Sequence, residues 1–461
     1  MSDMKKILFL NFENKLLGSV SKNELSIKYA SNATAKDHVL EPYSITANFM
    51  QTLLTDEEYE KYLSTYYGLE STNKRFIPYQ YFDSSSAEIK TRIVLIDNQN
   101  CIQEYIPSSP TLTSYETYLS DSFYVVHDNS NVYIFDGASV HIFRNGEKPT
   151  RYDNSLKVSF VKFYKDKCYF VTNDNPNKIF VSSETDLSKI VKGTLPTETL
   201  DFDTRYGTFQ DLLICDDYFY IIQDFGIAKI QIKKDETLFS YFKTNARIIK
   251  NTAKTVSKYI VFLSSAGLVR FDGNRLVLIC DNVISKCTKF GVAESFNNKY
   301  YLATQIKLET TINNVLLEID VDSENTHIFE VGNICELYAI EALDKYFLQA
   351  VKSGQSSNET IAIVSEKVDT NHVKLIEFNN CYLDSSDIKS INKIRLVASG
   401  RFSFSVTSNT GDKFSYSGTG PFVFDNIGLS GHYFSIKISS MYSFKIESIY
   451  IEYMQVEHDT F

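Results

Sequence analysis

Polar turns and aromatic-rich apolar segments alternate along this chain at a long, regular interval. A polar turn followed by an aromatic-rich strand appears as Asp121-Ser122-Phe123-Tyr124 and again as Asp217-Tyr218-Phe219-Tyr220. Six such phrases occur, and their fourth residues are 45, 51, 40, 41 and 46 positions apart. Those residues are Tyr124, Tyr169, Tyr220, Ile260, Tyr301 and Phe347. A period of about 45 residues indicates a repeat architecture in which each unit is one supersecondary structure.

Each repeat also has the internal pattern of several short strands. The clearest unit has apolar runs at 259–263, 268–271 and 276–279. Gly267 and Gly273 stand in the turns between them, where tight hairpins need the positive φ that glycine adopts freely. Four short strands in each unit of about 40–45 residues predict the blades of a β-propeller.

The predicted propeller extends over residues 91–375, but the pattern leaves its number of blades open. Six units are clear from residue 110 onward, and a further hairpin at 92–106 precedes them. That hairpin either completes a seventh blade or closes the ring by pairing with the last blade, so we expect six or seven. Closure matters because an open ring would leave unpaired strand edges.

The first 90 residues depart from the repeat and predict an N-terminal α/β arm. Residues 44–69 contain the one helical pattern, in which Phe49 and Tyr62 fall on one face. The acidic run at 56–58 suits the N-terminus of a helix, and strand-like pieces precede the helical pattern. We expect residues 1–90 to pack on the propeller or on a neighbouring subunit, so that a chain without them would still fold as a monomer.

From residue 376 the pattern changes to longer alternating strands separated by Ser, Gly and Asn turns. The strands are expected at 393–397, 401–407, 433–439 and 444–453. Alternation over such lengths predicts a β-sandwich at 376–461. The predicted fold is therefore mainly β: a six- or seven-bladed propeller, a C-terminal β-sandwich and an N-terminal α/β arm.

Composition and charge narrow the classes of function. The chain has 461 residues, 43% of them hydrophobic, which is enough for a large core and excludes a wholly disordered chain. It has 47 basic and 57 acidic side chains, a net charge of −10, which argues against a protein that coats nucleic acid. Negative walls nevertheless suit a surface past which DNA slides, because they repel phosphates. No apolar run approaches the ~18 residues of a membrane span, and we expect assembly in the cytosol.

Neither the cysteines nor the histidines form a motif that carries chemistry. The seven cysteines are scattered, without a Cys-x-x-Cys pair, which argues against a disulfide framework or a paired zinc site. Most stand in apolar stretches, so we interpret them as small core residues in a reduced compartment. The seven histidines form no His-Glu-x-x-His pattern, so a zinc protease is not expected. We predict no metal and no cofactor.

Two groups of carboxylates resemble catalytic or metal-binding spacings. Asp203 and Asp217 stand in acidic clusters that could hold the paired carboxylates of a glycosidase, although acids at strand ends are usually turn formers. Asp320, Asp322 and Glu324 follow the spacing that opens a calcium loop, but glycine is missing from its sixth position and an acid from its twelfth. We interpret the second group as a hairpin tip, and we predict no catalytic residue and no enzyme.

Three segments resemble the β-propeller structural proteins of tailed bacteriophages, and among them the packaged-DNA stabilisation proteins of the neck and tail. The first is the paired Phe-Asp-Gly hairpins at 135–137 and 271–273, which look like blade turns of that family. The second, at 178–188, is similar to a blade segment in which an apolar strand runs into Ser-Glu and an acidic turn. The third is the C-terminus at 428–438 and 446–451, which looks like the family's sandwich ending.

The resemblance implies a structural virion protein of the neck or tail that forms part of a symmetric assembly along the DNA exit path. Its partners would be itself, in a homo-oligomeric ring such as a hexamer, and other tail, neck or portal proteins. It implies location in the virion after assembly in the host cytoplasm, and no catalysis. Two alternatives stay open: a tail-tip propeller that binds a host receptor or glycan, and a propeller hydrolase or lyase that uses Asp203 or Asp217.

Overall fold

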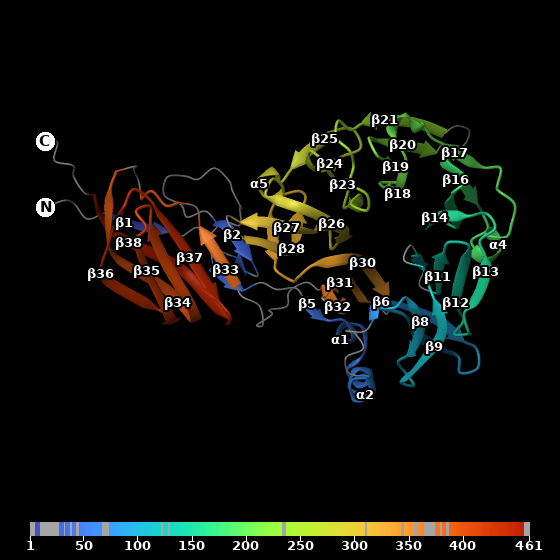
Figure 1. The fold of residues 1–461 in the computed structure, drawn as a ribbon, viewed down its shortest axis with the longest axis horizontal. Coiled ribbons are helices and arrows are strands. Elements are labelled where there is room, and N and C mark those ends of the chain that lie inside the picture. Colours follow the sequence, from blue (N-terminus) through green and yellow to red (C-terminus); the bar gives the residue numbers. More distant parts are fainter. Residues whose placement is uncertain are drawn as a thin grey trace.

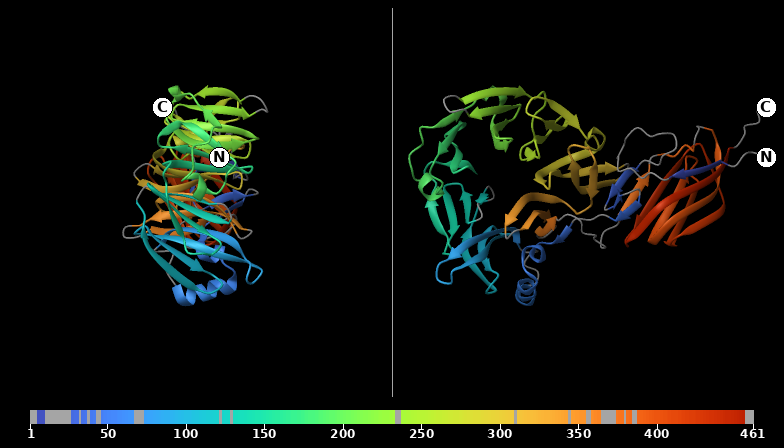
Figure 2. Two further views of the ribbon diagram at one scale, coloured as in Figure 1. Left: turned by 90° about the vertical axis from the view of Figure 1, so that its right-hand side faces the viewer. Right: turned by 180° about the vertical axis from the view of Figure 1, so that it is seen from behind.

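The computed structural model describes most of the chain, and the statements below concern that part. The described residues are 5–9, 27–31, 33–36, 39–42, 46–66, 73–120, 123–127, 130–232, 237–308, 311–342, 345–354, 358–363, 374–378, 380–383 and 387–455. They form a ring of four-stranded units beside a second β-rich body (Figure 1). Seen from behind, the second body lies beside the ring and not on one of its open faces (Figure 2).

Seven four-stranded antiparallel units make up the ring, so the propeller has seven blades. Blade 1 contains β6 (Asn73–Asp83), β7 (Glu88–Asp97), β8 (Cys101–Ile106) and β9 (Thr111–Tyr118), and blade 2 contains β10 (Tyr124–His127), β11 (Asn131–Asp136), β12 (Ser139–Arg144) and β13 (Thr150–Asp153). Blade 3 contains β14 (Val158–Tyr164), β15 (Lys167–Thr172), β16 (Asn175–Ser182) and β17 (Thr199–Asp201), and blade 4 contains β18 (Phe209–Cys215), β19 (Tyr218–Gln223), β20 (Gly226–Ile232) and β21 (Thr237–Lys243).

The remaining blades follow in chain order, with one exception at the end. Blade 5 contains β22 (Lys254–Val256), β23 (Tyr259–Ser264), β24 (Gly267–Phe271) and β25 (Leu276–Ile279), and blade 6 contains β26 (Cys287–Phe296), β27 (Lys299–Leu308), β28 (Thr311–Asp320) and β29 (Thr326–Phe329). Blade 7 contains β30 (Ile334–Ala342), β31 (Lys345–Ser353), β32 (Asn358–Ile363) and β5 (Thr46–Asn48). Short helical turns, α4 (Leu187–Ile190), η1 (Thr204–Tyr206) and α5 (Asp281–Ile284), lie in loops between strands.

The repeated phrase of the sequence has a direct structural meaning. In blades 3 and 4 its first residue, Asp166 or Asp217, is the second residue of the turn between the first two strands, and this turn has positive φ at both positions: 43° and 53° at Lys165 and Asp166, and 49° and 62° at Asp216 and Asp217. Turns with this geometry match the twist of the strands they join. The aromatic residues that follow pack between blades, as Tyr169 does against Phe219 at 4.9 Å between ring centroids. The repeated aromatic residues thus serve to pack neighbouring blades against each other.

The ring is closed by a strand from the opposite end of the chain. β5 pairs antiparallel with β32, with Ala47 opposite Ala362. The hairpin at 92–106 therefore does not close the ring: its residues belong to β7 and β8, inside blade 1. β5 thus completes blade 7 with residues that precede blade 1 in the chain.

The segment predicted as an arm at 1–90 is divided among other parts of the fold. The expected boundary at residue 90 falls inside β7, and the preceding β6 is the first strand of blade 1. The single predicted helix at 44–69 is two helices, α1 (Phe49–Leu53) and α2 (Asp56–Tyr66). They are separated by a capping box in which the Thr55 hydroxyl accepts from the Glu58 backbone and the Glu58 carboxylate accepts from the Thr55 backbone.

The C-terminal residues form two packed sheets that share one long strand. β36 (Phe422–Gly431), β38 (Phe444–Gln455), β1 (Lys5–Phe9), β4 (Val39–Pro42) and β3 (Ala33–Lys36) join the first half of β34 (Lys389–Ser408). Its second half pairs with β35 (Lys413–Thr419) and β37 (Phe434–Ser440), and β37 pairs with β33 (Lys374–Phe378). Residues of both sheets share one buried cluster, so the C-terminal body is a β-sandwich.

The sandwich is continuous with the propeller through hydrogen-bonded strands. β2 (Ile27–Ser31) pairs with β33 on one side, and its Ser31 stands parallel to Ile328 of β29 in blade 6 on the other. A single sheet of 14 strands therefore runs from blade 6 into the sandwich. The boundary expected at residue 376 falls inside β33 and inside this sheet.

Candidate binding site between two blades

A polar pocket of about 590 Å³ lies where blades 2 and 3 meet. Its wall combines aromatic rings, amides and side chains of both charges. The lining residues are Asn131, Tyr133, Arg144, Asn145, Phe163, Tyr164, Lys165, Asp166, Lys167, Thr185 and Asp186. Such a mixture suits a polar ligand that stacks on a ring and takes several hydrogen bonds.

Tight turns place the charged side chains at the pocket. Lys165 and Asp166 are the two turn residues between β14 and β15, and Arg144 ends β12 just before a turn. In that turn Gly146 has a φ of 66°, and a Cβ there would stand 2.3 Å from the Tyr81 ring of blade 1. Glycine is therefore required at this position for two reasons: it adopts the positive φ without strain, and it has no Cβ to clash with Tyr81.

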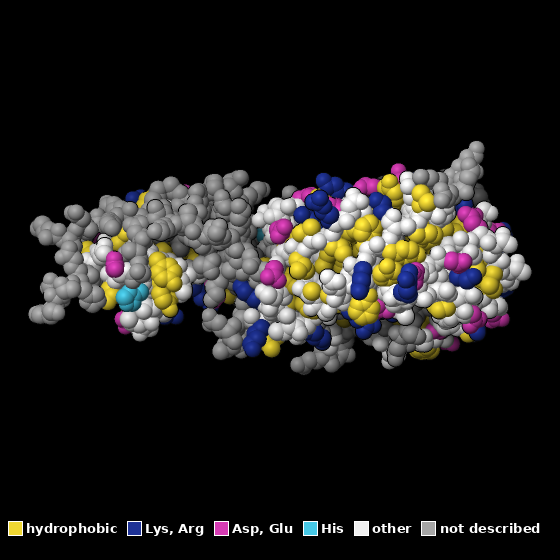
Figure 3. All heavy atoms as spheres, turned by 90° about the horizontal axis from the view of Figure 1, so that it is seen from above, with side chains coloured by type: hydrophobic (Ala, Val, Ile, Leu, Met, Phe, Trp, Pro, Cys, Tyr) yellow, Lys and Arg dark blue, Asp and Glu magenta, His cyan; other side chains and the backbone are white. Residues whose placement is uncertain are grey.

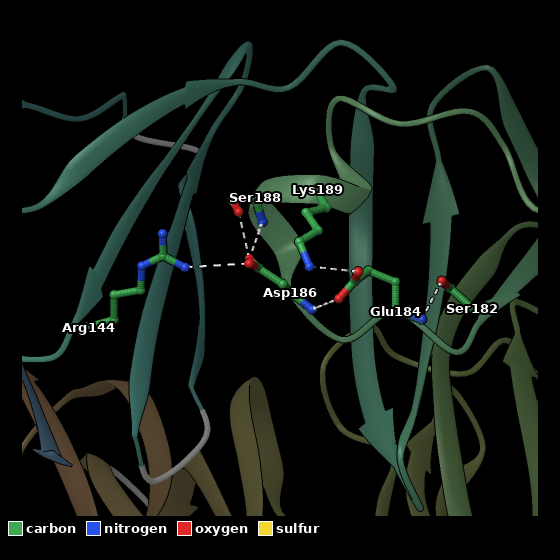
Figure 4. Close-up of polar contacts among 6 residues, drawn as sticks. All are labelled: Arg144, Ser182, Glu184, Asp186, Ser188 and Lys189. Carbon is green, nitrogen blue, oxygen red and sulfur yellow. Dashed lines mark hydrogen bonds and ion pairs between the residues drawn. The ribbon is translucent and has the colours of Figure 1, made fainter. Parts of the chain in front are cut away.

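Asp186 is the centre of the polar network beside the pocket (Figure 4). Its carboxylate accepts from the Ser188 backbone at 2.9 Å and from the Ser188 hydroxyl at 2.6 Å, which caps α4, and it lies 3.4 Å from Arg144 Nη1 of the neighbouring blade. Its own backbone N–H donates to Glu184, whose carboxylate also accepts from Lys189 at 3.1 Å. Burial acts to raise the pKa of Asp186, but the bonds from Ser188 and the charge of Arg144 outweigh it and lower the pKa.

A second network borders the pocket from blade 4. Lys165 Nζ and the Tyr164 hydroxyl both donate to the Asp217 carboxylate, at 3.0 and 3.1 Å. The hydrogen bonds with Tyr164 and Asp217 raise the pKa of Lys165, and the bond from Lys165 lowers the pKa of Asp217. Lys165 and Asp217 therefore keep their opposite charges at neutral pH.

The side chains of the network around Asp186 are held in ion pairs and hydrogen bonds. Asp186 caps a helix and pairs with Arg144, and its lowered pKa is the opposite of what a general acid needs. Neither histidine nor cysteine is among the residues that line the pocket. The geometry therefore favours non-covalent recognition of a polar ligand.

The two carboxylates proposed for glycosidase chemistry lie in separate turns. Asp203 caps η1 by accepting from the Arg205 backbone at 2.9 Å, and its other oxygen accepts from Arg205 Nε at 2.7 Å. The bonds from Arg205 lower the pKa of Asp203. Asp203 and Asp217 are thus each committed to a basic side chain, and neither has the raised pKa of a glycosidase acid.

Asp320, Asp322 and Glu324 occupy the turn of the β28–β29 hairpin, which confirms the structural interpretation of this group. Asp320 Oδ1 accepts from the backbone of Asp322 at 3.1 Å and of Ser323 at 2.9 Å. In the part of the chain that the structure describes, no three His, Cys, Asp or Glu side chains are grouped so as to hold a metal ion. All seven cysteines are free, and five of them are buried.

Sequence reasoning missed the inter-blade pocket as a site. Arg144, Lys165 and Asp186 stand about 20 positions apart in loops of two successive repeats, and no local motif links them. The available signal was indirect. The repeated phrase includes Asp166 and Lys167 of the pocket lining, and the 178–188 segment singled out by resemblance ends at the network around Asp186. Only the packing of blade against blade brings them together.

No described helix is long and apolar enough to cross a membrane. No family model matches the chain, and no curated protein matches it significantly. Three solved structures illustrate the likenesses found. BBS1N, solved in complex with ARL6DN, has a TM-score of 0.44 and 10% identity over 65% of this chain and 95% of its own.

The other two are similarly distant. The Pan2 WD40 domain of Neurospora crassa has a TM-score of 0.38 and 9% identity, over 70% of this chain and 95% of its own. YCF48 from Cyanidioschyzon merolae has a TM-score of 0.41 and 11% identity, over 64% and 97%. The assignment of a β-propeller stands on the sheet topology of the chain itself.

Proposed function

We propose that the chain is a non-catalytic assembly protein, and that it serves as a structural component of the neck or tail of a tailed bacteriophage. The observation that carries the proposal is the sheet of 14 strands that runs from blade 6 into the sandwich. Backbone hydrogen bonds, and not a loose linker, join the two bodies, which suits a subunit that must hold its neighbours at fixed positions.

The electrostatics of the polar pocket support a role without catalysis. Its main carboxylate caps a helix and pairs with a cation, so it stays ionised and neither donates nor takes up a proton near neutral pH. The net charge of −10 suits a wall past which DNA moves, because phosphates are repelled from it. The place in a phage particle comes from the sequence resemblance at 135–137, 178–188 and 428–438.

Native mass spectrometry and negative-stain imaging test this proposal. The purified protein is measured alone and after mixing with phage portal and tail proteins. We expect a symmetric homo-oligomer, or a monomer that joins those proteins in a defined complex. A protein that stays monomeric in both conditions, or that degrades a cell-wall polysaccharide, contradicts the proposal.

The pocket between blades 2 and 3 favours a second candidate function, the binding of a host glycan. Aromatic rings, amides and an Arg–Asp pair line one cavity, as sugar hydroxyls and ring faces require. A glycan array followed by titration calorimetry tests it. Arg144→Ala should abolish any binding, and Lys157→Ala, which removes an exposed pair with Asp174 outside the pocket lining, should leave it unchanged.

A further inference from the structure

A second pocket, the sandwich pocket, has a volume of about 710 Å³ and lies over the sheet in which β34 is flanked by β36 and β38. Ile394 and Leu396 of β34 are buried in the core of the sandwich, so the alternate residues Lys393 and Arg395 face outward and line the pocket. The residues that line it belong to the C-terminal body (Figure 1), which separates it from the pocket between blades 2 and 3.

One row of side chains across these three strands balances its own charges. Lys393 of β34 stands opposite Asp425 of β36 on one side and opposite Glu452 of β38 on the other. Lys393 Nζ lies 2.9 Å from Asp425 Oδ1, and the hydrogen bond with Asp425 raises the pKa of Lys393. The ammonium group is therefore compensated within its row, and Glu452 brings a carboxylate into the lining of the pocket. A carboxylate has about four acceptor positions, enough to accept hydrogen bonds from a ligand as well.

The next row has a cation without an opposing carboxylate. Arg395 of β34 stands opposite Val423 of β36 and Tyr450 of β38. Its guanidinium carbon lies 5.7 Å from the centre of the Tyr450 ring, within the range of a cation–π contact. Arg395 and Val423 are exposed. This row therefore presents a positive charge that the register leaves uncompensated, next to an aromatic ring and an aliphatic side chain.

The order of these groups distinguishes the sandwich pocket from the rest of the surface. On the propeller seen from above, hydrophobic side chains and charges of both signs are interspersed (Figure 3). In the sandwich pocket, strand pairing sets a carboxylate row beside a cation–aromatic row, and residues two apart on a strand are roughly 7 Å apart. One ligand of that size can therefore contact both rows, and the side chains that hold it stand on paired strands.

We propose that the sandwich pocket binds an acidic sugar chain, in which a carboxylate stands among several hydroxyl groups. The planar guanidinium of Arg395 matches a carboxylate with two parallel N–H···O bonds. The carboxylate of Glu452 accepts from sugar hydroxyls, and the apolar face of a sugar ring packs on Tyr450 and Val423. The inference goes beyond the proposed assembly role, because it assigns a ligand to the sandwich.

The charges of the pocket favour this class of ligand over other anions. A nucleic-acid strand, or a run of acidic residues in a peptide, brings several negative charges close together, which Asp425 and Glu452 repel. A neutral sugar leaves Arg395 without a counter-charge. One cation beside carboxylate acceptors therefore matches a ligand that has a single negative charge on a sugar unit and many hydroxyl donors.

A glycan array and titration calorimetry of the full chain test the inference. The array carries oligogalacturonate and sialyllactose beside the methyl ester of each, which has the same sugar units without the negative charge. We expect binding of at least one acid, with a dissociation constant roughly tenfold or more below that of its methyl ester. Equal binding of acid and ester, or binding of neither, overturns the proposal.

Replacement of Arg395 tests the site itself. Arg395→Ala should raise the dissociation constant of the acid that binds roughly tenfold or more, because a charge-assisted contact is lost. Arg401→Ala is the matched control and should leave the constant unchanged: Arg401 is another exposed arginine of β34 over a ring, 5.1 Å from the centre of Tyr442, but it does not line the pocket. Circular dichroism verifies that both variants are folded.

The remaining outcomes separate this inference from its competitors. Sugar binding that is lost with Arg144→Ala and kept with Arg395→Ala would place the ligand between blades 2 and 3 and overturn the inference. An oligonucleotide or a polyglutamate peptide that binds through Arg395 as tightly as the sugar would indicate a general anion site and overturn it as well. Acid-selective binding that depends on Arg395, in a protein that joins no virion protein, would support the inference and contradict the proposed function alone.

Discussion

At the scale of single residues, two buried carboxylates fasten the strands of their blades together. Glu104 in β8 accepts from Tyr79, Tyr115 and Arg92, each at 2.7 Å. Glu318 in β28 accepts from Lys299 at 2.5 Å and Tyr301 at 2.6 Å, and lies 3.0 Å from His327 Nδ1. The two side chains are 1% and 2% exposed. A buried charge is tolerated only when it is paired and hydrogen-bonded, and both of these are.

Glu318 should make the stability of the propeller fall in acid. Burial acts to raise its pKa, but the bonds from His327, Lys299 and Tyr301 outweigh it and hold the pKa to about 2, against an ordinary value of 4.5. The stabilisation is complete above pH 4.5 and is lost as the pH falls toward 2, and it amounts to roughly 3 kcal/mol. Urea unfolding of the unmodified chain and of Glu318→Gln at pH 7, 5 and 3 measures it.

Glu318→Gln should be less stable than the unmodified chain at pH 7, and its free energy of unfolding should change less between pH 5 and pH 3. Glu198→Gln is the control, because Glu198 forms an exposed pair with Lys167 that contributes less than about 1 kcal/mol. Equal pH dependence in the unmodified chain and in Glu318→Gln would show that the carboxylate does not have this role.

At the scale of elements, turns and corners are fixed by a few backbone positions. Strand β34 passes from one sheet of the sandwich to the other around Gly400, where pairing changes from β38 to β35 and β37. Gly400 has a φ of 82°, and a Cβ there would stand 2.3 Å from the Ser443 carbonyl oxygen. A strand that serves two sheets needs such a bend, and glycine permits both the conformation and the close approach.

Gly400→Ala should therefore destabilise the sandwich. The unfavourable φ alone costs about 1–3 kcal/mol, and displacement of the Ser443 backbone adds to it. Gly411→Ala is the matched control: Gly411 has a φ of 95°, but a Cβ there would meet nothing within 4 Å. Thermal unfolding should show a larger loss for Gly400→Ala than for Gly411→Ala. Equal losses of stability in the two variants would mean that the backbone around Ser443 moves away from the added Cβ at no cost in free energy.

β5, α1 and β6 belong to the propeller, so truncations before and after these elements should differ in whether the propeller folds. A chain that begins at residue 46 keeps β5 and α1, whose Phe49, Met50 and Leu53 are buried against blade residues. A chain that begins at residue 91 loses β5, both helices and β6, and leaves blades 1 and 7 incomplete. We expect the first to keep a cooperative propeller transition by circular dichroism, and the second to lose it.

This expectation replaces the one drawn from the sequence, in which a chain without residues 1–90 remained a folded monomer. A folded, soluble protein that begins at residue 91 would mean that closure by β5 and β6 is dispensable.

At the scale of the whole molecule, strand pairing through β2 and β33 connects the propeller and the sandwich. Glu377 of β33 stands opposite Tyr29 of β2 on one side and Lys437 of β37 on the other. The connection from blade 6 to the sandwich passes through this strand. An interrupted ladder at β33 would leave two bodies joined only by chain segments.

Glu377→Pro should loosen the two bodies. Proline has no backbone N–H and cannot donate to the ladder, so at least one hydrogen bond of about 1 kcal/mol is lost and the strand is distorted. Small-angle scattering should then show a larger radius of gyration. Glu377→Ala, which removes only the ion pair to Lys437 at 2.9 Å, should leave the radius unchanged. An unchanged radius in the proline variant would show that other contacts hold the sandwich.

The amino-acid sequence by itself determined what is local. The period of the repeat, the strands of each blade and the turn pairs such as Lys165-Asp166 follow from alternation and turn chemistry over a few residues. The hairpin tip at Asp320 was predictable for the same reason. The break between the two helices was also readable, since Thr55 and Glu58 form a capping box within four residues.

The tertiary structure decided everything that joins distant parts of the chain. Ring closure pairs Ala47 with Ala362, the link to the sandwich pairs Ser31 with Ile328, and the pocket unites Arg144 with Asp186 from neighbouring blades. A short strand such as β5 carries no mark of its partner, because any strand edge offers the same backbone groups. Which edge it meets depends on how many blades complete the ring, and that is set by the packing of all seven together.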